Sequence, residues 1–242
     1  MVKRKPTGRT GKKRILVIDV GGTHVKLLVT GMKEPIKIVS GPTLTANSMV
    51  RKVKKALKDC SYDVISIGYP GPVVGGRPLR EPHNLGRGWV GFDFRKAFDR
   101  PVKITNDAAM QALGSYKGGR LLFLGLGTGL GSAMIVDETV IPMELAHLPY
   151  KHGKTYEDYL GLRGLKRLGR KKWEREVRKV VAELQETLEV NQVVLGGGNA
   201  RKLKKLPPGS ILGSNQNAFL GGFHMWNRRR TSRRQQGRSS GN

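Results

Sequence analysis

The sequence predicts an α/β protein made of two similar halves that flank a cleft. Strands come first as an antiparallel meander and then alternate with helices, and this order recurs after residue 120. Three glycine-rich turns, each directly after a predicted strand, are the second observation. A length of 242 residues is enough for one large domain or two modest ones with a buried core.

The elements of the first half follow from apolar runs and periodicity. A short, continuous apolar run after residue 14 predicts a buried strand, and apolar residues at helical spacing after residue 45 predict a helix. A Gly/Pro-rich loop spans 69–90, and loops of this length in compact domains are usually functional. The expected strands are 15–20, 25–30, 36–39, 64–67 and 102–104, and the expected helices are 46–58 and 106–116.

The second half repeats the scheme. Strands are expected at 121–124, 130–136 and 193–195, a mainly helical segment at 155–188 and a closing helix at 216–226. We therefore expect an N-terminal α/β domain over 15–115 and a C-terminal α/β domain over 116–226, with the last helix packing back on the first domain. The segments 1–14 and 227–242 are basic, lack apolar periodicity and are expected to be disordered tails.

The charge is strongly positive, with 45 Lys and Arg against 18 Asp and Glu, or +27. The two tails carry seven and six basic residues and no acid, which leaves +14 on residues 15–226. Residues 161–179 hold nine Lys and Arg, and smaller clusters lie at 51–58 and 201–205. Each cluster is compatible with a solvated helix face, but together they indicate a polyanionic partner.

Several classes are excluded. The single cysteine, Cys60, rules out an intramolecular disulfide and a cysteine-rich zinc site. No apolar run approaches the roughly 20 residues that cross a bilayer, and the short apolar run after the basic N-terminus is interrupted by Asp19, so we expect no signal peptide and no membrane partner. The cytoplasm is the expected location.

The three glycine turns are 19–23 (DVGGT), 125–131 (GLGTGLG) and 196–199 (GGGN). Glycine lets backbone amides approach a phosphate closely, and the Thr23 and Thr128 hydroxyls add donors. The alternating glycines of the second turn do not fit G-x-G-x-x-G, which argues against a dinucleotide fold.

Acidic residues lie next to these turns. Asp19 is compatible with a turn-forming role or with holding a phosphate-bound Mg²⁺ through water. Asn106 suits a helix N-cap, and the Asp107 carboxylate could accept the proton of a substrate hydroxyl that attacks phosphorus. Glu144, His147 and Glu157 form a third polar group in the second half.

In this order, the motifs resemble those of the ROK family of sugar kinases, in the actin/hexokinase/Hsp70 superfamily, and most closely its polyphosphate glucokinase branch. The resemblance runs from about residue 15 to 226. It rests on the three glycine turns and on three further segments, which are HNL with GW at 83–89, TNDA at 105–108 and ELAH at 144–147.

The resemblance implies two ribonuclease H-like (actin-like ATPase) domains that flank a cleft. It also implies a phosphotransferase with an alcohol acceptor, namely a polyphosphate-dependent glucokinase that phosphorylates the 6-hydroxyl of glucose with Mg²⁺ as cofactor. Asp107 would be the general base, and Asp19 would orient Mg²⁺. Sugar contacts would come from Asn84, Asn106, Asp107, Glu144, His147 and Glu157. Donor phosphates would be bound by Asp19, Gly21, Gly22, Thr23, Lys26, Gly127, Thr128, Gly129, Gly197 and Gly198.

The sequence departs from the family pattern at two site positions: Ala146 replaces a glycine beside His147, and His83 replaces a proline before Asn84. It also lacks the zinc cysteines of many ROK members, which agrees with the polyphosphate branch. Two alternatives stay open, an ATP-dependent ROK kinase for glucose or another hexose, and a non-catalytic polyanion- or nucleic-acid-binding protein. The expected partners are glucose, inorganic polyphosphate or ATP, and a second copy in a homodimer, while nucleic-acid contact by the tails has no support in the motifs.

Overall fold

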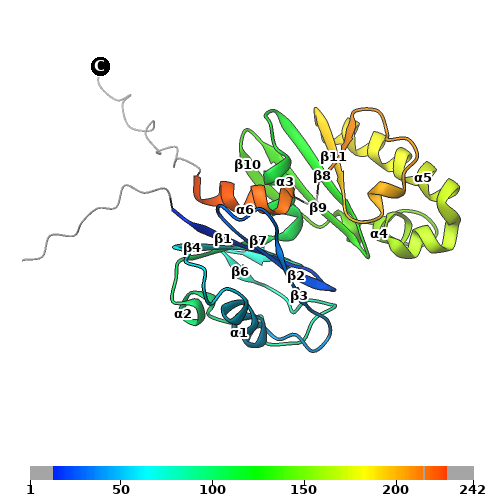
Figure 1. Ribbon diagram of the computed structural model, residues 1–242. Helices are drawn as coiled ribbons and strands as arrows, with labels where there is room; N and C mark the ends of the chain where they lie inside the picture. Colours follow the sequence, from blue (N-terminus) through cyan, green and yellow to red (C-terminus); the bar gives the residue numbers. More distant parts are fainter. Residues whose placement is uncertain (1–12, 215, 228–242) are drawn as a thin grey trace, which may run out of the picture.

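Two five-stranded sheets of the same topology form the two lobes of the protein, seen in a computed structural model that describes residues 13–214 and 216–227 (Figure 1). The strand orders are β3-β2-β1-β4-β7 and β10-β9-β8-β11-β12. In each sheet an antiparallel meander of three strands is followed by two strands that pair in parallel. The repeated topology confirms the predicted α/β fold of two similar halves.

The strands of the first lobe are β1 (Ile15–Val20), β2 (His24–Val29), β3 (Ile36–Val39), β4 (Val64–Tyr69) and β7 (Val102–Asn106), with a small hairpin of β5 (Val73–Val74) and β6 (Arg77–Pro78). Those of the second lobe are β8 (Arg120–Leu126), β9 (Leu130–Val136), β10 (Thr139–Met143), β11 (Gln192–Gly196) and β12 (Ser210–Leu212). The helices are α1 (Ala46–Ala56), α2 (Phe94–Phe98), α3 (Asp107–Ser115), α4 (Tyr156–Leu160), α5 (Leu162–Thr187) and α6 (Asn217–Asn227), and two short 3-10 turns are η1 (Leu145–His147) and η2 (Ala200–Lys202).

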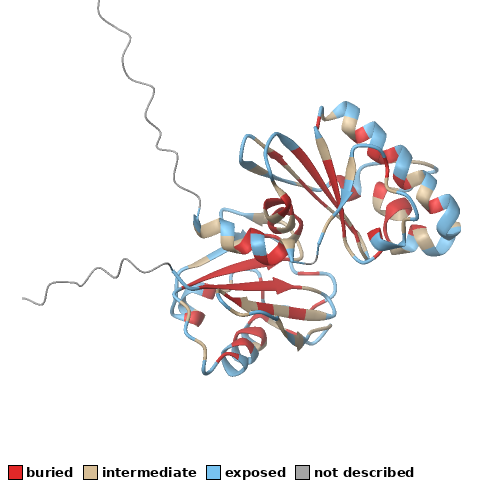
Figure 2. Ribbon diagram, turned by 45° about the horizontal axis from the view of Figure 1, so that its top comes forward, coloured by how far each residue is buried: buried red, intermediate tan, exposed pale blue. Residues whose placement is uncertain are grey.

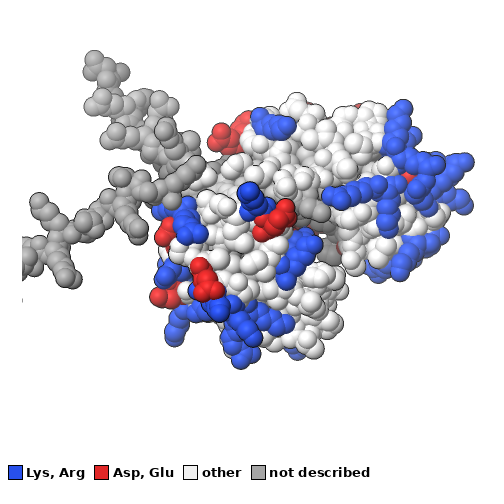
Figure 3. Space-filling model, viewed as in Figure 1, with Lys and Arg blue, Asp and Glu red and all other residues white. Residues whose placement is uncertain are grey.

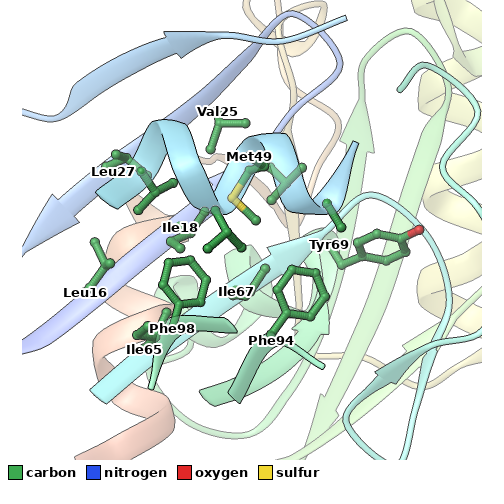
Figure 4. Close-up of a cluster of buried hydrophobic side chains, with 14 of the residues drawn as sticks. Leu16, Ile18, Val25, Leu27, Met49, Ile65, Ile67, Tyr69, Phe94 and Phe98 are labelled. Atoms are coloured by element: carbon green, nitrogen blue, oxygen red, sulfur yellow. The ribbon is translucent and has the colours of Figure 1, made fainter. Parts of the chain in front are cut away.

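Strand β1 contributes to two different cores, because successive side chains point to opposite faces of the sheet. Leu16 and Ile18 pack against α1 and α2 in the cluster drawn in Figure 4, whereas Ile15 and Val17 pack against α6. Both faces are covered, which explains why the strand is a continuous apolar run. By the same alternation, Asp19 lies on the face that α6 covers.

The second sheet is covered in the same way. Helices α4 and α5 pack on one face, where Trp173 is fully buried, and α3 packs on the other. Figure 2 shows the buried residues along the central strands and on the inward side of the covering helices. Thus α3, which follows the first sheet in the chain, lies on the second sheet, and α6, which follows the second, lies on the first.

Helices α3 and α6 pack against each other between the two sheets (Figure 1). Their backbones approach so closely that a Cβ at Gly114 would lie within 2.7 Å of the Gly221 nitrogen, and a Cβ at Gly221 would collide with the Met110 carbonyl. The two glycines therefore permit the contact that joins the lobes.

The structure corrects several expected elements. The predicted loop 69–90 contains the β5–β6 hairpin, and the helical segment 155–188 is interrupted at Gly161 and kinked at Gly169, which has φ 72° and ψ 157°. The expectations omitted α2, which has only five residues, and the edge strands β10 and β12, whose side chains are mostly exposed and so lack a clear apolar pattern. The two predicted basic tails lie outside the described residues except at 13, 14 and 227.

Candidate active site

The first glycine turn begins beside Asp19, a carboxylate that is only 9% exposed. Asp19 and Lys26 are opposite each other on β1 and β2, and Lys26 Nζ lies 3.2 Å from Asp19 Oδ2. The turn is fixed by the Gly21 amide, which donates to the His24 carbonyl at 3.1 Å, and by Ser40 Oγ, which donates to the Gly21 carbonyl at 2.7 Å. The structure therefore places a buried acid and a partner cation at the start of an ordered turn.

Asp107 follows β7, and one strand, β4, lies between β7 and the strand of Asp19, β1. In the β1–β4 register Gly68 is opposite Asp19, and a Cβ at Gly68 would be 3.6 Å from the Asp107 Cα. Burial, together with the charges of Asp19 and Glu144, raises the pKa of Asp107 from 3.8 to about 7, although the Ala108 amide, 2.7 Å from Oδ1, acts in the opposite direction. A carboxyl group with a pKa near neutrality is suited to accept a proton at physiological pH.

The second glycine turn lies against the N-terminal end of α3, the helix that begins at Asp107. A Cβ at Gly131 would be 3.2 Å from the Ala108 Cβ, so the absence of a side chain lets β9 approach the first turn of α3. Since Ala108 follows Asp107 directly, the C-terminal end of the second glycine turn, at Gly131, is close to the candidate base.

Glu157 connects this turn to α5. Its Oε2 accepts the Leu130 amide at 3.1 Å and its Oε1 lies 3.1 Å from Arg163 Nη2. A Cβ at Gly129 would collide with the Glu157 carboxylate, so a larger residue there would displace this side chain. Glu157 therefore orders the second turn in addition to any contact with a sugar.

The third glycine turn is tied to the second by Asn199. The Asn199 side-chain amide donates to the Gly127 carbonyl at 2.8 Å, and its backbone amide donates to the Leu126 carbonyl at 2.9 Å. Gly197 has φ +78°, and a Cβ there would crowd the Leu126 backbone. The turns that contain Gly127 and Gly198 consequently form one continuous surface.

Two of the predicted sugar contacts come from the first lobe. The Asn84 side chain lies beside the first turn, since a Cβ at Gly22 would be 3.2 Å from the Asn84 Cβ. Asn106 is buried, caps α3 by accepting the Ala108 and Ala109 amides, and donates to the Gly71 carbonyl at 3.1 Å. Asn106 is therefore the N-cap of α3, as its position in the sequence suggested, and its side-chain nitrogen is hydrogen-bonded to the Gly71 carbonyl.

Glu144 and His147 come from the second lobe, at the turn that follows β10. Both are exposed, with His147 Nε2 3.9 Å from Glu144 Oε2. The Leu145 amide donates to Ser132 Oγ at 3.1 Å, which anchors the turn to β9. The effect of Glu144 on the pKa of Asp107 shows that the two lobes present these carboxylates to the same region.

The donor set is compatible with Mg²⁺. Asp19 and Asp107 repel each other electrostatically, and a divalent cation would relieve that repulsion. Within 13–214 and 216–227, no group of three His, Cys, Asp or Glu residues is arranged to hold a metal. Mg²⁺ commonly binds through one or two carboxylates, retained waters and substrate phosphates, so a site that has Asp19 as its protein ligand would fit this ion.

A basic surface starts at the second and third turns. The Leu162 amide, at the N-terminus of α5, donates to the Gly127 carbonyl at 3.1 Å, and α5 carries nine exposed Lys and Arg. The 201–205 segment follows the third turn directly, and the Lys204 amide donates to Glu174 Oε1 of α5 at 3.2 Å. Figure 3 shows these cations gathered over the α5 side of the second lobe.

Sequence reasoning missed three residues that organise the site. Asn199 belongs to the third glycine motif, but the motif assigns it no role. Arg163 is one of nine Lys and Arg in 161–179, and the sequence does not distinguish it from the others. No sequence motif pointed to Glu81. Its carboxylate accepts hydrogen bonds from the backbone amides of Gly88, Trp89 and Val90 at 3.1–3.3 Å, and so it holds the segment that follows Asn84.

Comparisons with known proteins agree with this architecture. The model of the ROK family matches residues 15–142. A polyphosphate glucokinase of Mycobacterium tuberculosis is 27% identical over 227 residues, covering 83% of each chain. None of the helices in the described part of this chain is long and apolar enough to cross a membrane.

Solved structures share the fold. The inorganic polyphosphate/ATP-glucomannokinase from Arthrobacter sp. strain KM superposes with a TM-score of 0.74 at 21% identity, over 88% of this chain and 98% of that chain. A ROK family glucokinase from Streptomyces griseus, in complex with glucose and AMPPNP, gives 0.68 at 17% identity, over 88% and 98%. These relatives are phosphotransferases with an alcohol acceptor, as predicted for this chain. The chain belongs to the ROK family.

Proposed function

We propose that the protein is a polyphosphate-dependent glucokinase, which transfers a terminal phosphoryl group to the 6-hydroxyl of glucose. The observation that carries the catalytic part is Asp107, whose pKa is raised to about 7 beside Asp19 and the second glycine turn. In its ionised form Asp107 accepts the hydroxyl proton as the sugar oxygen attacks phosphorus. The phosphoanhydride bond breaks, and its electron pair leaves on the shortened polyphosphate.

The sugar would be held between the lobes by Asn84 and Asn106 from one side and by Glu144, His147 and Glu157 from the other. Glu157 already accepts two hydrogen bonds, but each carboxylate oxygen has a second lone pair for a sugar hydroxyl. Orientation of the hydroxyl toward phosphorus supplies much of the rate enhancement in phosphoryl transfer.

The donor phosphates would lie against Gly21, Gly22 and Thr23 of the first turn and against Gly127, Thr128, Gly129, Gly197 and Gly198 of the other two. Lys26, 3.2 Å from Asp19, would neutralise one phosphate charge. Mg²⁺, held by Asp19 through water, would supply further charge neutralisation. Arg163 forms an ion pair with Glu157 through Nη2, and its side chain is 72% exposed. The other nitrogens of the guanidinium are therefore available to a phosphate oxygen.

Support for polyphosphate rather than ATP comes from the basic surface. Helix α5 has 26 residues with a kink at Gly169, and beyond the kink it carries Lys171, Lys172 and Arg175, which are exposed and without an ion pair to any described residue. A nucleotide ends after three phosphates, whereas a polyphosphate chain continues and can neutralise many cations. Each neutralised charge releases a counterion, as in nucleic-acid binding.

The donor comparison tests the proposal. Glucose phosphorylation is measured with ATP and with long-chain polyphosphate between 50 and 200 mM salt, concentrations over which about three phosphate contacts cost roughly tenfold or more in affinity. We expect a lower KM for polyphosphate that rises steeply with salt. Equal and salt-insensitive use of both donors would contradict polyphosphate specificity.

A pair of variants with equal charge change sharpens the comparison. Lys171→Gln/Lys172→Gln/Arg175→Gln on α5 is expected to raise the KM for polyphosphate about tenfold and leave ATP kinetics unchanged. The scattered control is Lys33→Gln/Arg77→Gln/Lys117→Gln, three exposed residues in the β2–β3 connection, in β6 and in the α3–β8 connection. Similar KM values for both triple variants would refute a role for α5.

The alternatives make different predictions. A kinase for another hexose would prefer a different sugar in a small panel, and a non-catalytic polyanion-binding protein would form no glucose 6-phosphate with either donor. The division at residues 15–115 and 116–226, a homodimer and a cytoplasmic location stay predictions.

A further inference from the structure

A second basic surface lies on the first lobe, away from the candidate active site. Helix α1 and the residue after its C-cap carry five exposed basic side chains with only one adjacent acid. Helix α2, which contacts α1, adds two more, which lie beside the exposed capping acids Asp93 and Asp99, so most of the excess positive charge is on α1. We call these residues the α1–α2 basic face: Arg51, Lys52, Lys54, Lys55, Lys58, Arg95 and Lys96. Figure 3 shows many Lys and Arg over this part of the lobe, with some Asp and Glu beside them.

This face is on the opposite side of the first sheet from the lobe junction. Met49, Val50 and Val53 of α1 pack on the core that includes Leu16 and Ile18, whereas the other face of the sheet is covered by α6. Asp19 lies on the α6 side, so the α1–α2 basic face and the active-site carboxylates are separated by the sheet.

The charges on α1 are poorly compensated. Arg51 is three residues from Lys54 and four from Lys55, spacings at which like charges on a helix destabilise it. The helix dipole favours Lys54 and Lys55 in the last turn but does not account for Arg51. Among the described residues, the five cations of α1 and its C-terminal end form one ion pair, Lys58–Asp59 at 4.0 Å, between two largely exposed side chains, and it neutralises little.

The side chains of the α1–α2 basic face favour a polyanion that has no nucleobases. Proteins that bind single-stranded nucleic acid combine cations with exposed aromatic rings on which bases stack. The aromatic residues of α2, Phe94 and Phe98, are buried, and α1 contains none. Cations without stacking surfaces suit a chain that presents only phosphate oxygens.

We propose that the α1–α2 basic face is a second binding surface for inorganic polyphosphate, separate from the donor site. The basic face itself follows from the structure, and only the choice of polyphosphate as its ligand rests on the proposed function. A surface of this kind retains a long chain while its end reacts elsewhere, so it acts on long polyphosphate and not on ATP or tripolyphosphate.

The test measures binding without turnover. Full-length wild-type protein, the Arg51→Gln/Lys54→Gln/Lys55→Gln variant and the scattered control are titrated, without glucose, into end-labelled long-chain polyphosphate at several salt concentrations. We expect the α1 variant to bind about tenfold more weakly at 100 mM salt, with a salt slope smaller by about two to three, whereas the control stays near wild type. Glutamine keeps helix propensity, and circular dichroism verifies folding.

Kinetics and competition complete the test. In the α1 variant the KM for long-chain polyphosphate should rise while kinetics with ATP and tripolyphosphate stay unchanged, and Arg51→Lys should bind as wild type. Equal loss in the scattered control, or an equal effect on ATP, would overturn a local site. Competition by single-stranded DNA at equal phosphate concentration would overturn the choice of polyphosphate.

The two proposals fail in different ways. If the wild type binds polyphosphate through this face but cannot use it as donor, the proposed function is wrong and the second surface stands. If polyphosphate-dependent turnover persists and the α1 variant binds unchanged, the second surface is wrong and the proposed function stands.

Discussion

Replacement of Asp107 by asparagine should greatly lower activity and at the same time stabilise the protein above about pH 4, most strongly above pH 7. Burial of the carboxyl group, together with the charges of Asp19 and Glu144, raises its pKa to about 7. Asparagine has nearly the same shape, retains an oxygen for the Ala108 amide and carries no charge. Loss of a general base typically lowers kcat/KM by about 10²–10⁴.

The magnitude of the stability effect follows from the pKa. Because the pKa is higher in the folded state than the usual 3.8, ionisation of Asp107 opposes folding. The cost is absent below about pH 4, grows as the pH rises toward 7 and is complete above it. For a rise in pKa from 3.8 to about 7, ionisation of Asp107 costs about 2 kcal/mol of folding free energy at pH 5 and about 4 kcal/mol at pH 8. These are upper values, because the side chain is partly exposed.

The assay is thermal or chemical unfolding of wild type and Asp107→Asn at pH 5 and pH 8. The free energy of unfolding of the variant should exceed that of wild type by more at pH 8 than at pH 5, with a difference of up to about 2 kcal/mol. For wild type, kcat/KM should fall about tenfold per pH unit below about 7. A stability difference that does not depend on pH, or undiminished glucose 6-phosphate formation by the variant, would refute the assignment.

Three further substitutions probe the packing and the turns. Gly114→Ala should lower Tm strongly, because its Cβ would collide with the α6 backbone, whereas Gly198→Ala, with open space around its Cβ, should leave Tm unchanged; similar Tm values would refute the tight helix contact. Asn199→Ala removes the donor to the Gly127 carbonyl and should cost about 1–3 kcal/mol and raise the KM of the phosphate donor, whereas an unchanged KM would separate the third turn from donor binding. Glu81→Gln leaves one amide oxygen for three backbone amides and should raise the KM for glucose with little effect on that for the donor, and an equal rise in both would contradict a local role.

The sequence determined which elements form the two sheets and which motifs end their central strands. Continuous apolar runs predict central strands because both faces are buried, as in β1, and the glycine turns that follow them predict a phosphate site. The order of these motifs sufficed to identify the family. Elements with few buried side chains, such as α2 and the edge strands β10 and β12, gave no such signal.

Only the tertiary structure decided how the site residues act on one another. Periodicity places Asp19 and Asp107 at strand ends, but the raised pKa of Asp107 depends on burial and on Glu144 from the other lobe. The packing of α3 on the second sheet and its close contact with α6 through Gly114 and Gly221 bring those lobes together, and these are long-range contacts that local pattern does not encode. The sequence thus fixes which chemical groups are present, whereas the low-dielectric, charge-coupled environment that tunes them exists only after distant segments pack.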